Sequence, residues 1–139
     1  MIDKTIFKPV EIKGNKIFIY DGIRKKSDSV INISIIGPGL LGGSVALASK
    51  ELSLVDKISL WVRRSDAISE LVEADIADHV SDDFQEIIPE ADLIVFATPV
   101  GAVGDILRKI IPIAKTNAVI TDLCSVKGCV VELIDELLL

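Results

Sequence analysis

The sequence predicts an α/β fold, with a doubly wound, mainly parallel sheet and an N-terminal β-hairpin extension. From residue 30 onward, short runs rich in β-branched residues alternate with stretches whose apolar residues recur at helical spacing, which is typical of strand–helix–strand units. A glycine-rich turn directly follows the first of those runs. The length of 139 residues, 50% of them hydrophobic, suits one domain with a sizeable core.

The first 29 residues are expected to form a β-hairpin and a linker. Thr5–Ile12 and Lys16–Tyr20 are rich in strand-forming residues, and the glycine-containing segment 13–15 between them is suited to a turn. Pro9 cannot donate a backbone hydrogen bond, so its strand is expected at an edge. The hairpin is expected to pair with an open edge of the main sheet. The polar residues that follow are typical of a linker, which leaves 30–139 as the main domain.

Five strands are expected in the main domain, joined by right-handed crossovers into one sheet that is one strand short of the six-stranded doubly wound form. The fourth is the most apolar, with LIVFA in its middle, as expected for a strand that is buried on both faces. In chain order, the predicted strands are Val30–Ile36, Lys57–Val62, Ile76–Val80, Asp92–Thr98 and Ala118–Asp122.

Helices are expected wherever apolar residues recur three and four positions apart. Ser65 is a suitable N-cap for the second helix, Pro89 stops a short third helix over Asp82–Ile88, and Pro112 ends the fourth. The residues expected to face the core are Leu41, Val45, Ala48 and Leu52 in the first helix, Ile68, Leu71 and Val72 in the second, Val103, Ile106, Leu107, Ile110 and Ile111 in the fourth, and Val126, Val130, Leu133, Ile134, Leu137 and Leu138 in the last.

Charge and residue counts argue against several classes of function. The 15 Lys and Arg residues against 21 Asp and Glu give a net charge of −6, which argues against a nucleic-acid partner. No membrane span or secretory signal is recognised, so a cytoplasmic protein with reduced thiols at Cys124 and Cys129 is expected. The single histidine, His79, excludes a metal site that needs two and is expected at the surface or at a strand edge.

Residues 36–42 match the pattern G-x-G-x-x-G between a predicted strand and a predicted helix, which is the context that binding of a dinucleotide requires. Gly37 permits the tight turn, Gly39 leaves room for a diphosphate, and Gly42 lets the helix pack closely on the sheet. The free amides of the first helical turn would bind the diphosphate, although a purely structural turn is the alternative. The expected cofactor contacts in this Rossmann-like turn are Gly37, Pro38, Gly39, Leu40, Leu41 and Gly42.

The second strand is followed by Arg63, Arg64 and Ser65, without the acidic residue that would bind the hydroxyls of an adenosine ribose. Two guanidinium groups and a hydroxyl are suited to a 2′-phosphate instead. The sequence therefore predicts that NADP is preferred, with NAD possible. The alternative is that both arginines are solvated surface charges.

Three segments together resemble the prephenate/arogenate dehydrogenase family of tyrosine biosynthesis: IGPGLLGGS at 36–44, ADLIVFATPV at 91–100 and TDLCSVKG at 121–128. The resemblance covers roughly residues 30–139, which correspond to the N-terminal nucleotide-binding domain of that family. It implies oxidation of a ring alcohol by hydride transfer to a nicotinamide, with loss of carbon dioxide. It also implies that Thr98 and Pro99 lie beside the nicotinamide ribose.

The same resemblance implies a catalytic role for Ser125, which matches the family serine that orients the substrate hydroxyl and the catalytic histidine. From its position alone, Ser125 is equally suited to cap the last helix. The family histidine would follow residue 139, as would the helical domain that carries substrate contacts and the homodimer interface. The chain is therefore expected to be a truncated piece that binds cofactor but is catalytically incomplete.

Two other interpretations stay open. One is the cofactor domain of another enzyme, such as a 3-hydroxyacid dehydrogenase or a pyrroline-carboxylate reductase. The other is a stand-alone dinucleotide-binding or redox-sensing module. The D-x-x-S-V-K-G segment at 122–128 favours the first family, whose small-molecule substrate is prephenate or arogenate.

Overall fold

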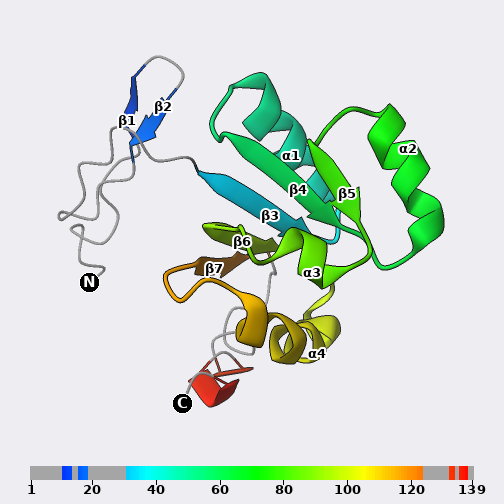
Figure 1. The fold of residues 1–139 in the computed structure, drawn as a ribbon, viewed down its shortest axis with the longest axis vertical. Coiled ribbons are helices and arrows are strands. Elements are labelled where there is room, and N and C mark those ends of the chain that lie inside the picture. Colours follow the sequence, from blue (N-terminus) through cyan, green and yellow to red (C-terminus); the bar gives the residue numbers. More distant parts are fainter. Residues whose placement is uncertain (1–10, 14–15, 19–30, 124–131, 134, 138–139) are drawn as a thin grey trace.

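A five-stranded parallel sheet forms the centre of the fold, with helices on both faces (Figure 1). The computed structural model describes residues 11–13, 16–18, 31–123, 132–133 and 135–137. The strand order is β5-β4-β3-β6-β7, so the chain begins in the middle of the sheet, moves out to one edge and returns to build the other side. This order confirms the doubly wound α/β fold. The strands are β3 (Asn32–Ile36), β4 (Lys57–Trp61), β5 (His79–Ser81), β6 (Leu93–Phe96) and β7 (Val119–Asp122).

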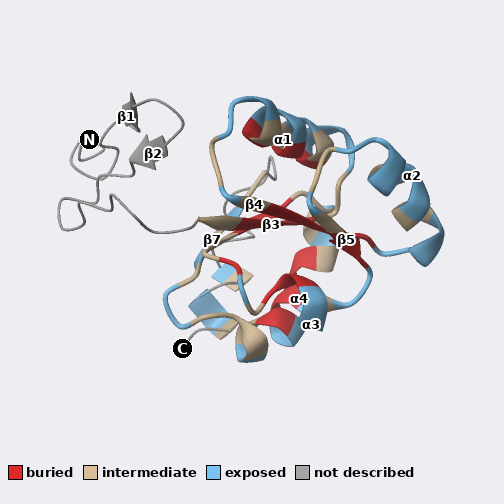
Figure 2. Ribbon diagram, turned by 45° about the horizontal axis from the view of Figure 1, so that its top comes forward, coloured by how far each residue is buried: buried red, intermediate tan, exposed pale blue. Residues whose placement is uncertain are grey.

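Two apolar cores separate the layers of the fold. Figure 2 shows the buried sheet between α1 and α2 on one side and α3 and α4 on the other. On the first side, η1 leads into α2, and on the second side η2 follows α4. The helical elements are α1 (Leu40–Glu51), η1 (Ser65–Ala67), α2 (Ile68–Glu73), α3 (Phe84–Ile87), α4 (Val100–Ile110) and η2 (Ile111–Ile113).

The buried face of α1 differs from the expected one. Gly42, Ala46 and Ser49 are buried, whereas Leu41 and Leu52 are 60% and 62% exposed. The glycine turn explains the difference, because Gly42 must lie against the sheet and therefore directs the residues four and seven positions later toward it. The expected stripe was wrong for Leu41, Ala48 and Leu52, which are exposed, whereas Val45 packs against the core as expected. Close backbone packing at Gly42 sets the rotation of this helix.

The second helix also departs from the prediction. Ser65 is the first residue of η1 and not its N-cap, and the preceding Arg64 makes no capping hydrogen bond through its side chain. Ile68 and Leu71 pack against the core beside α1, but Val72 is 58% exposed. A helix of six residues offers the sheet only a narrow stripe, and Val72, adjacent to Leu71, turns away from it.

The apolar stripe of α4 is confirmed. Its members Val103, Ile106, Leu107 and Ile110 are buried against the sheet. Near the end of the chain, Leu137 packs against the same core, and a Leu133 side-chain carbon lies 3.4 Å from where a Cβ on Gly104 would lie. Both leucines were expected on the inner face of the last helix. The rest of that helix's predicted stripe, at residues 126, 130, 134 and 138, lies outside the described residues.

The N-terminal hairpin is confirmed for its central residues. β1 (Glu11–Lys13) pairs antiparallel with β2 (Lys16–Phe18). These two strands form a sheet of their own, so the expected pairing with an edge of the main sheet is not found among the described residues. Pro9 and the linker lie outside them. No helix in the described part of the chain has the length and apolar character needed to cross a membrane.

At the amino-terminal edge of the sheet, three aspartate side chains accept backbone hydrogen bonds. Each aspartate directly precedes a strand, and each donor lies just before a neighbouring strand or within its first two residues. The carboxylates therefore tie strand ends together where a regular ladder would stop. The bonds run from Ile31 N to Asp56 Oδ2 at 2.6 Å, from Ile58 N to Asp78 Oδ2 at 2.7 Å and from Asn32 N to Asp92 Oδ2 at 2.9 Å.

Candidate functional site

A cleft of about 990 Å³ lies at the carboxyl ends of β3, β4 and β6. Strands β3 and β6 are neighbours at the point where the strand order reverses, which is where open parallel sheets bind their ligands. The volume lies at the upper end of the range for ligand cavities. The cleft is lined by Gly37, Pro38, Gly39, Trp61, Val62, Arg63, Arg64, Ala67, Phe84, Ala97, Thr98, Pro99, Gly101, Ala102, Asp105, Ile106 and Lys109.

The first glycine of the turn has a conformation that other residues rarely adopt. Gly37 has a φ of +85°, and a Cβ on it would lie 2.7 Å from Thr98 Cγ2. Its amide donates to the Trp61 carbonyl oxygen at 3.0 Å, which ties the turn to the end of β4. Both the backbone angle and the contact with β6 therefore require glycine at this position.

Gly39 and Gly42 have opposite surroundings. A Cβ on Gly42 would lie 2.5 Å from the Gly37 carbonyl oxygen and 2.9 Å from Ala97 Cβ, so α1 packs on the sheet at the closest distance that glycine permits. A Cβ on Gly39 would meet nothing within 4 Å, although Gly39 lines the cleft. A side chain at Gly39 would therefore extend into space that a ligand could use.

The N-terminus of α1 is suited to an anion. The N-cap residue is Gly39, no side chain caps the helix, and the first turn contains no acidic residue. The amides of a first helical turn have no partner within the helix, and the helix dipole adds partial positive charge there. This end of α1, beside the open space at Gly39, fits a diphosphate group held by backbone amides.

Two arginines line the cleft beyond β4. Among the described residues, no carboxylate forms an ion pair with Arg63. Arg64, by contrast, is exposed, and its Nε lies 3.3 Å from Asp66 Oδ1. Residues 61–65 contain no acid. Two guanidinium groups in one part of the cleft lining are suited to an anionic group of a ligand.

Most of the site residues expected from the sequence meet at the cleft. Gly37, Pro38, Gly39, Arg63, Arg64, Thr98 and Pro99 all line it. Four others, Leu40, Leu41, Gly42 and Ser65, do not, and the side chain of Leu40 is 89% exposed. The side chains of these residues, including the Ser65 hydroxyl that was expected to contact the cofactor, are therefore not part of the cleft wall. Ser125 lies outside the described residues.

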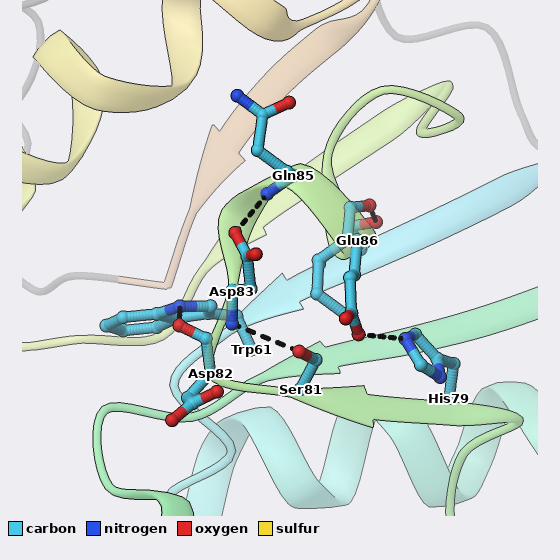
Figure 3. A network of polar contacts seen from close by, with 9 residues as sticks. Trp61, His79, Ser81, Asp82, Asp83, Gln85 and Glu86 are labelled. Carbon is cyan, nitrogen blue, oxygen red and sulfur yellow. Dashed lines mark hydrogen bonds and ion pairs between the residues drawn. The ribbon is translucent and has the colours of Figure 1, made fainter.

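An aromatic pair forms a part of the cleft wall that the sequence analysis missed. The rings of Trp61 and Phe84 stack, with centroids 4.4 Å apart and planes 13° from parallel. Trp61 Nε1 donates to the Asp82 carbonyl oxygen at 2.9 Å (Figure 3). Asp83 caps α3 by accepting from Gln85 N at 2.8 Å. The ring contact and the Trp61 hydrogen bond hold the start of α3 against the end of β4, two positions before Arg63.

One face of α4 forms another missed part of the wall. Gly101, Ala102, Asp105, Ile106 and Lys109 line the cleft from this helix. Their spacing of three and four positions indicates one helical face, but the sequence gives no sign that this face borders a ligand cleft. The signal that could have found them is their place after Thr98 and Pro99, at the strand end beside the switch point.

His79 has a structural position away from the cleft, as expected. It begins the edge strand β5, and its Nε2 lies 3.1 Å from Glu86 Oε2 on α3 (Figure 3). It is not a cleft-lining residue. The pair joins β5 to α3 on the side remote from Trp61.

Comparisons with known proteins agree with this geometry. Residues 45–139 match the family model of the prephenate dehydrogenase nucleotide-binding domain. A cyclohexadienyl dehydrogenase from Zymomonas mobilis is 34% identical over 111 residues, which cover 76% of this chain and 36% of that protein. The fold is similar to a crystal structure of prephenate dehydrogenase from A. aeolicus in complex with hydroxyphenyl propionate and NAD+, with a TM-score of 0.73, 28% identity, and coverage of 81% of this chain and 40% of that one.

A second similar structure is arogenate dehydrogenase from Synechocystis, with a TM-score of 0.71, 26% identity, and coverage of 77% of this chain and 37% of that chain. The chain therefore spans about two fifths of the length of the relatives it matches.

Proposed function

This chain belongs to the prephenate dehydrogenase family, of which it carries the nucleotide-binding domain, and we propose that its cleft binds a nicotinamide adenine dinucleotide, with NADP preferred over NAD. In the whole protein, this domain serves the oxidative decarboxylation of prephenate or arogenate in tyrosine biosynthesis. The proposal includes the family's homodimer and a cytoplasmic location. It also includes the division of the chain into a hairpin and linker over 1–29 and the dinucleotide-binding domain over 30–139.

The observation that carries the proposal is the contrast among the three glycines of the turn. Gly37 and Gly42 are fixed by contacts inside the protein, whereas Gly39 opens onto the cleft at the uncapped N-terminus of α1. A turn with a purely structural role would not need open space at the middle glycine. This contrast supports a bound diphosphate and disfavours the nucleotide-free interpretation.

The residues of the cleft have separate tasks in this proposal. The amides at the start of α1 hold the diphosphate, and Thr98 and Pro99 at the end of β6 position the nicotinamide ribose. The bound cofactor supplies a hydride acceptor. Ser125 orients the substrate hydroxyl, an assignment that rests on the resemblance of residues 121–128 to the family segment.

The preference for NADP is supported by the end of β4. Arg63 lines the cleft, and residues 61–65 lack the carboxylate that would repel a 2′-phosphate. A hydrogen bond between charged groups contributes about 1.5–3 kcal/mol, which corresponds to roughly tenfold or more in affinity. NAD is the competing ligand, because the A. aeolicus relative is described in complex with NAD+.

Calorimetric titration of the 139-residue chain with NADP+ and with NAD+ tests both parts of the proposal. We expect both to bind, NADP+ more tightly, and we expect Arg63→Ala to reduce the ratio of the two affinities about tenfold. If neither NADP+ nor NAD+ gave a binding signal, the proposed binding function would be refuted. An unchanged ratio in Arg63→Ala would refute only the assigned basis of the preference.

A further inference from the structure

Helix α4 brings a lysine into the same cleft as the arginines of β4. We propose that Lys109 is a specificity-determining residue, which binds the 2′-phosphate of the adenosine half together with Arg63. This inference rests on the proposed function, because it assigns a second source of selectivity within that cleft. Sequence patterns around the end of the second strand give no indication of it, since Lys109 lies more than 40 positions farther along the chain.

The charges of the cleft lining differ in sign from the charge of the whole chain. The chain has a net charge of −6, yet the cleft is lined by Arg63, Arg64 and Lys109 against a single carboxylate, Asp105. Positive charge gathered in one concave site of an acidic protein attracts an anionic ligand. The cleft therefore fits a ligand with several phosphate charges.

Some of the charged residues that line the cleft form ion pairs within the protein, and the others can bind a ligand. Asp105 Oδ1 lies 3.0 Å from Arg108 Nη1, so its charge is matched by a residue that does not line the cleft. Arg64 shares its charge with Asp66. Among the described residues, no carboxylate within ion-pair distance is found for Arg63 or Lys109. These two cations, one from each wall, are the ones that a ligand phosphate can bind.

The position of Lys109 along α4 identifies the end of the ligand it serves. The helix begins at Val100, next to the proposed nicotinamide contacts Thr98 and Pro99. At 1.5 Å per residue, Lys109 lies about 13 Å farther along the axis, too far to serve the nicotinamide. The diphosphate already has the amides of α1. The remaining anionic group of an NADP molecule is the 2′-phosphate.

The surface between these positions is suited to the adenine ring. Ile106 and Ala102 line the cleft about one and two turns before Lys109, and Phe84 lines it from α3. A flat apolar base packs well against such a surface. With adenine there, the adjoining ribose would carry its 2′-phosphate toward Lys109 on α4 and Arg63 after β4.

The test compares Lys109→Gln with Lys57→Gln in the 139-residue chain. Lys57 is the first residue of β4, at the end of the strand opposite to the cleft, so its replacement removes the same charge far from the cleft. Dissociation constants for NADP+ and NAD+ are measured by calorimetry and by the fluorescence of Trp61, the single tryptophan, which lines the cleft. Lys109→Gln is expected to weaken NADP+ binding about three- to tenfold and NAD+ binding less than twofold. Lys57→Gln should leave both unchanged, and Lys109→Arg should keep the preference.

The outcomes separate this inference from the function on which it rests. A wild-type chain that binds neither dinucleotide, or both equally, would overturn the proposed preference and the role of Lys109 with it. A wild-type preference that survives intact in Lys109→Gln would overturn only the role of Lys109. Equal weakening of NADP+ and NAD+ would show that Lys109 acts on a group common to both, and would also overturn the role in selectivity.

Discussion

Replacing Gly42 with alanine tests whether close packing of α1 shapes the turn. A Cβ at this position would lie 2.5 Å from the Gly37 carbonyl oxygen, 2.9 Å from Ala97 Cβ and 3.2 Å from Ile35 Cγ2. The nearest of these atoms belongs to the backbone of the turn and cannot move aside as the end of a flexible side chain can. The helix must therefore shift away from the sheet, and the turn must shift with it.

The expected magnitude follows from two opposing effects. Overpacking a core costs about 1–3 kcal/mol. Because the added Cβ meets a backbone oxygen, we expect the cost of this substitution at the upper end of that range, about 3 kcal/mol. Alanine is favoured over glycine inside a helix by about 1 kcal/mol, which offsets part of that cost. The free energy of unfolding should fall by about 2 kcal/mol, which lowers the Tm of a domain of this size by roughly 8 °C.

Urea and thermal unfolding measure this effect, with Gly101→Ala as the matched control. Gly101 lies in the first turn of α4, and a Cβ there would meet nothing within 4 Å. The control should therefore gain up to about 1 kcal/mol. If Gly42→Ala were as stable as wild type, or gained stability as the control should, the close-packing argument would be refuted.

Three further substitutions have expected results. Gly39→Val should lower the free energy of unfolding by about 1 kcal/mol, because valine is a poor N-cap residue. It should weaken binding of NADP+ and NAD+ at least tenfold, since its side chain enters the cleft, and calorimetry that finds normal binding would contradict the assignment of the diphosphate. Asp83→Ala removes the cap of α3 and should cost about 1 kcal/mol in urea unfolding, whereas an unchanged midpoint would mean that the bond to Gln85 contributes nothing. Ala46→Leu should lose about 1–3 kcal/mol while Leu41→Gln stays near wild type, and the reverse order of their Tm values would disprove the observed rotation of α1.

The sequence was sufficient to predict the architecture because the strand and helix patterns are local. The alternating runs after residue 30 and the stripe of α4 were confirmed. The face of α1 could not be predicted from hydrophobicity, because the approach of Gly42 to Ala97 overrides the preference of leucine for the interior. Leu41 and Leu52 accordingly remain exposed.

The candidate site divides in a similar way. The glycine turn and the residues after the second strand lie at places that the fold class specifies, so Gly39 and Arg63 could be identified from spacing. Thr98 was identified from the resemblance to the family segment. Phe84 and Lys109 could not, because they reach the cleft through the packing of α3 and α4 against the sheet. Their contribution depends on contacts between segments distant in the chain, and a periodic pattern carries no information about such contacts.

The two ends of the sheet have different chemistry. At one end, Asp56, Asp78 and Asp92 hold the backbones of adjacent strands in register. At the other, the residues after β4 and β6 border the cleft and form none of those particular bonds. Substitutions after the carboxyl ends of the strands can therefore change the ligand preference. The aspartates before the strands continue to hold the sheet in register.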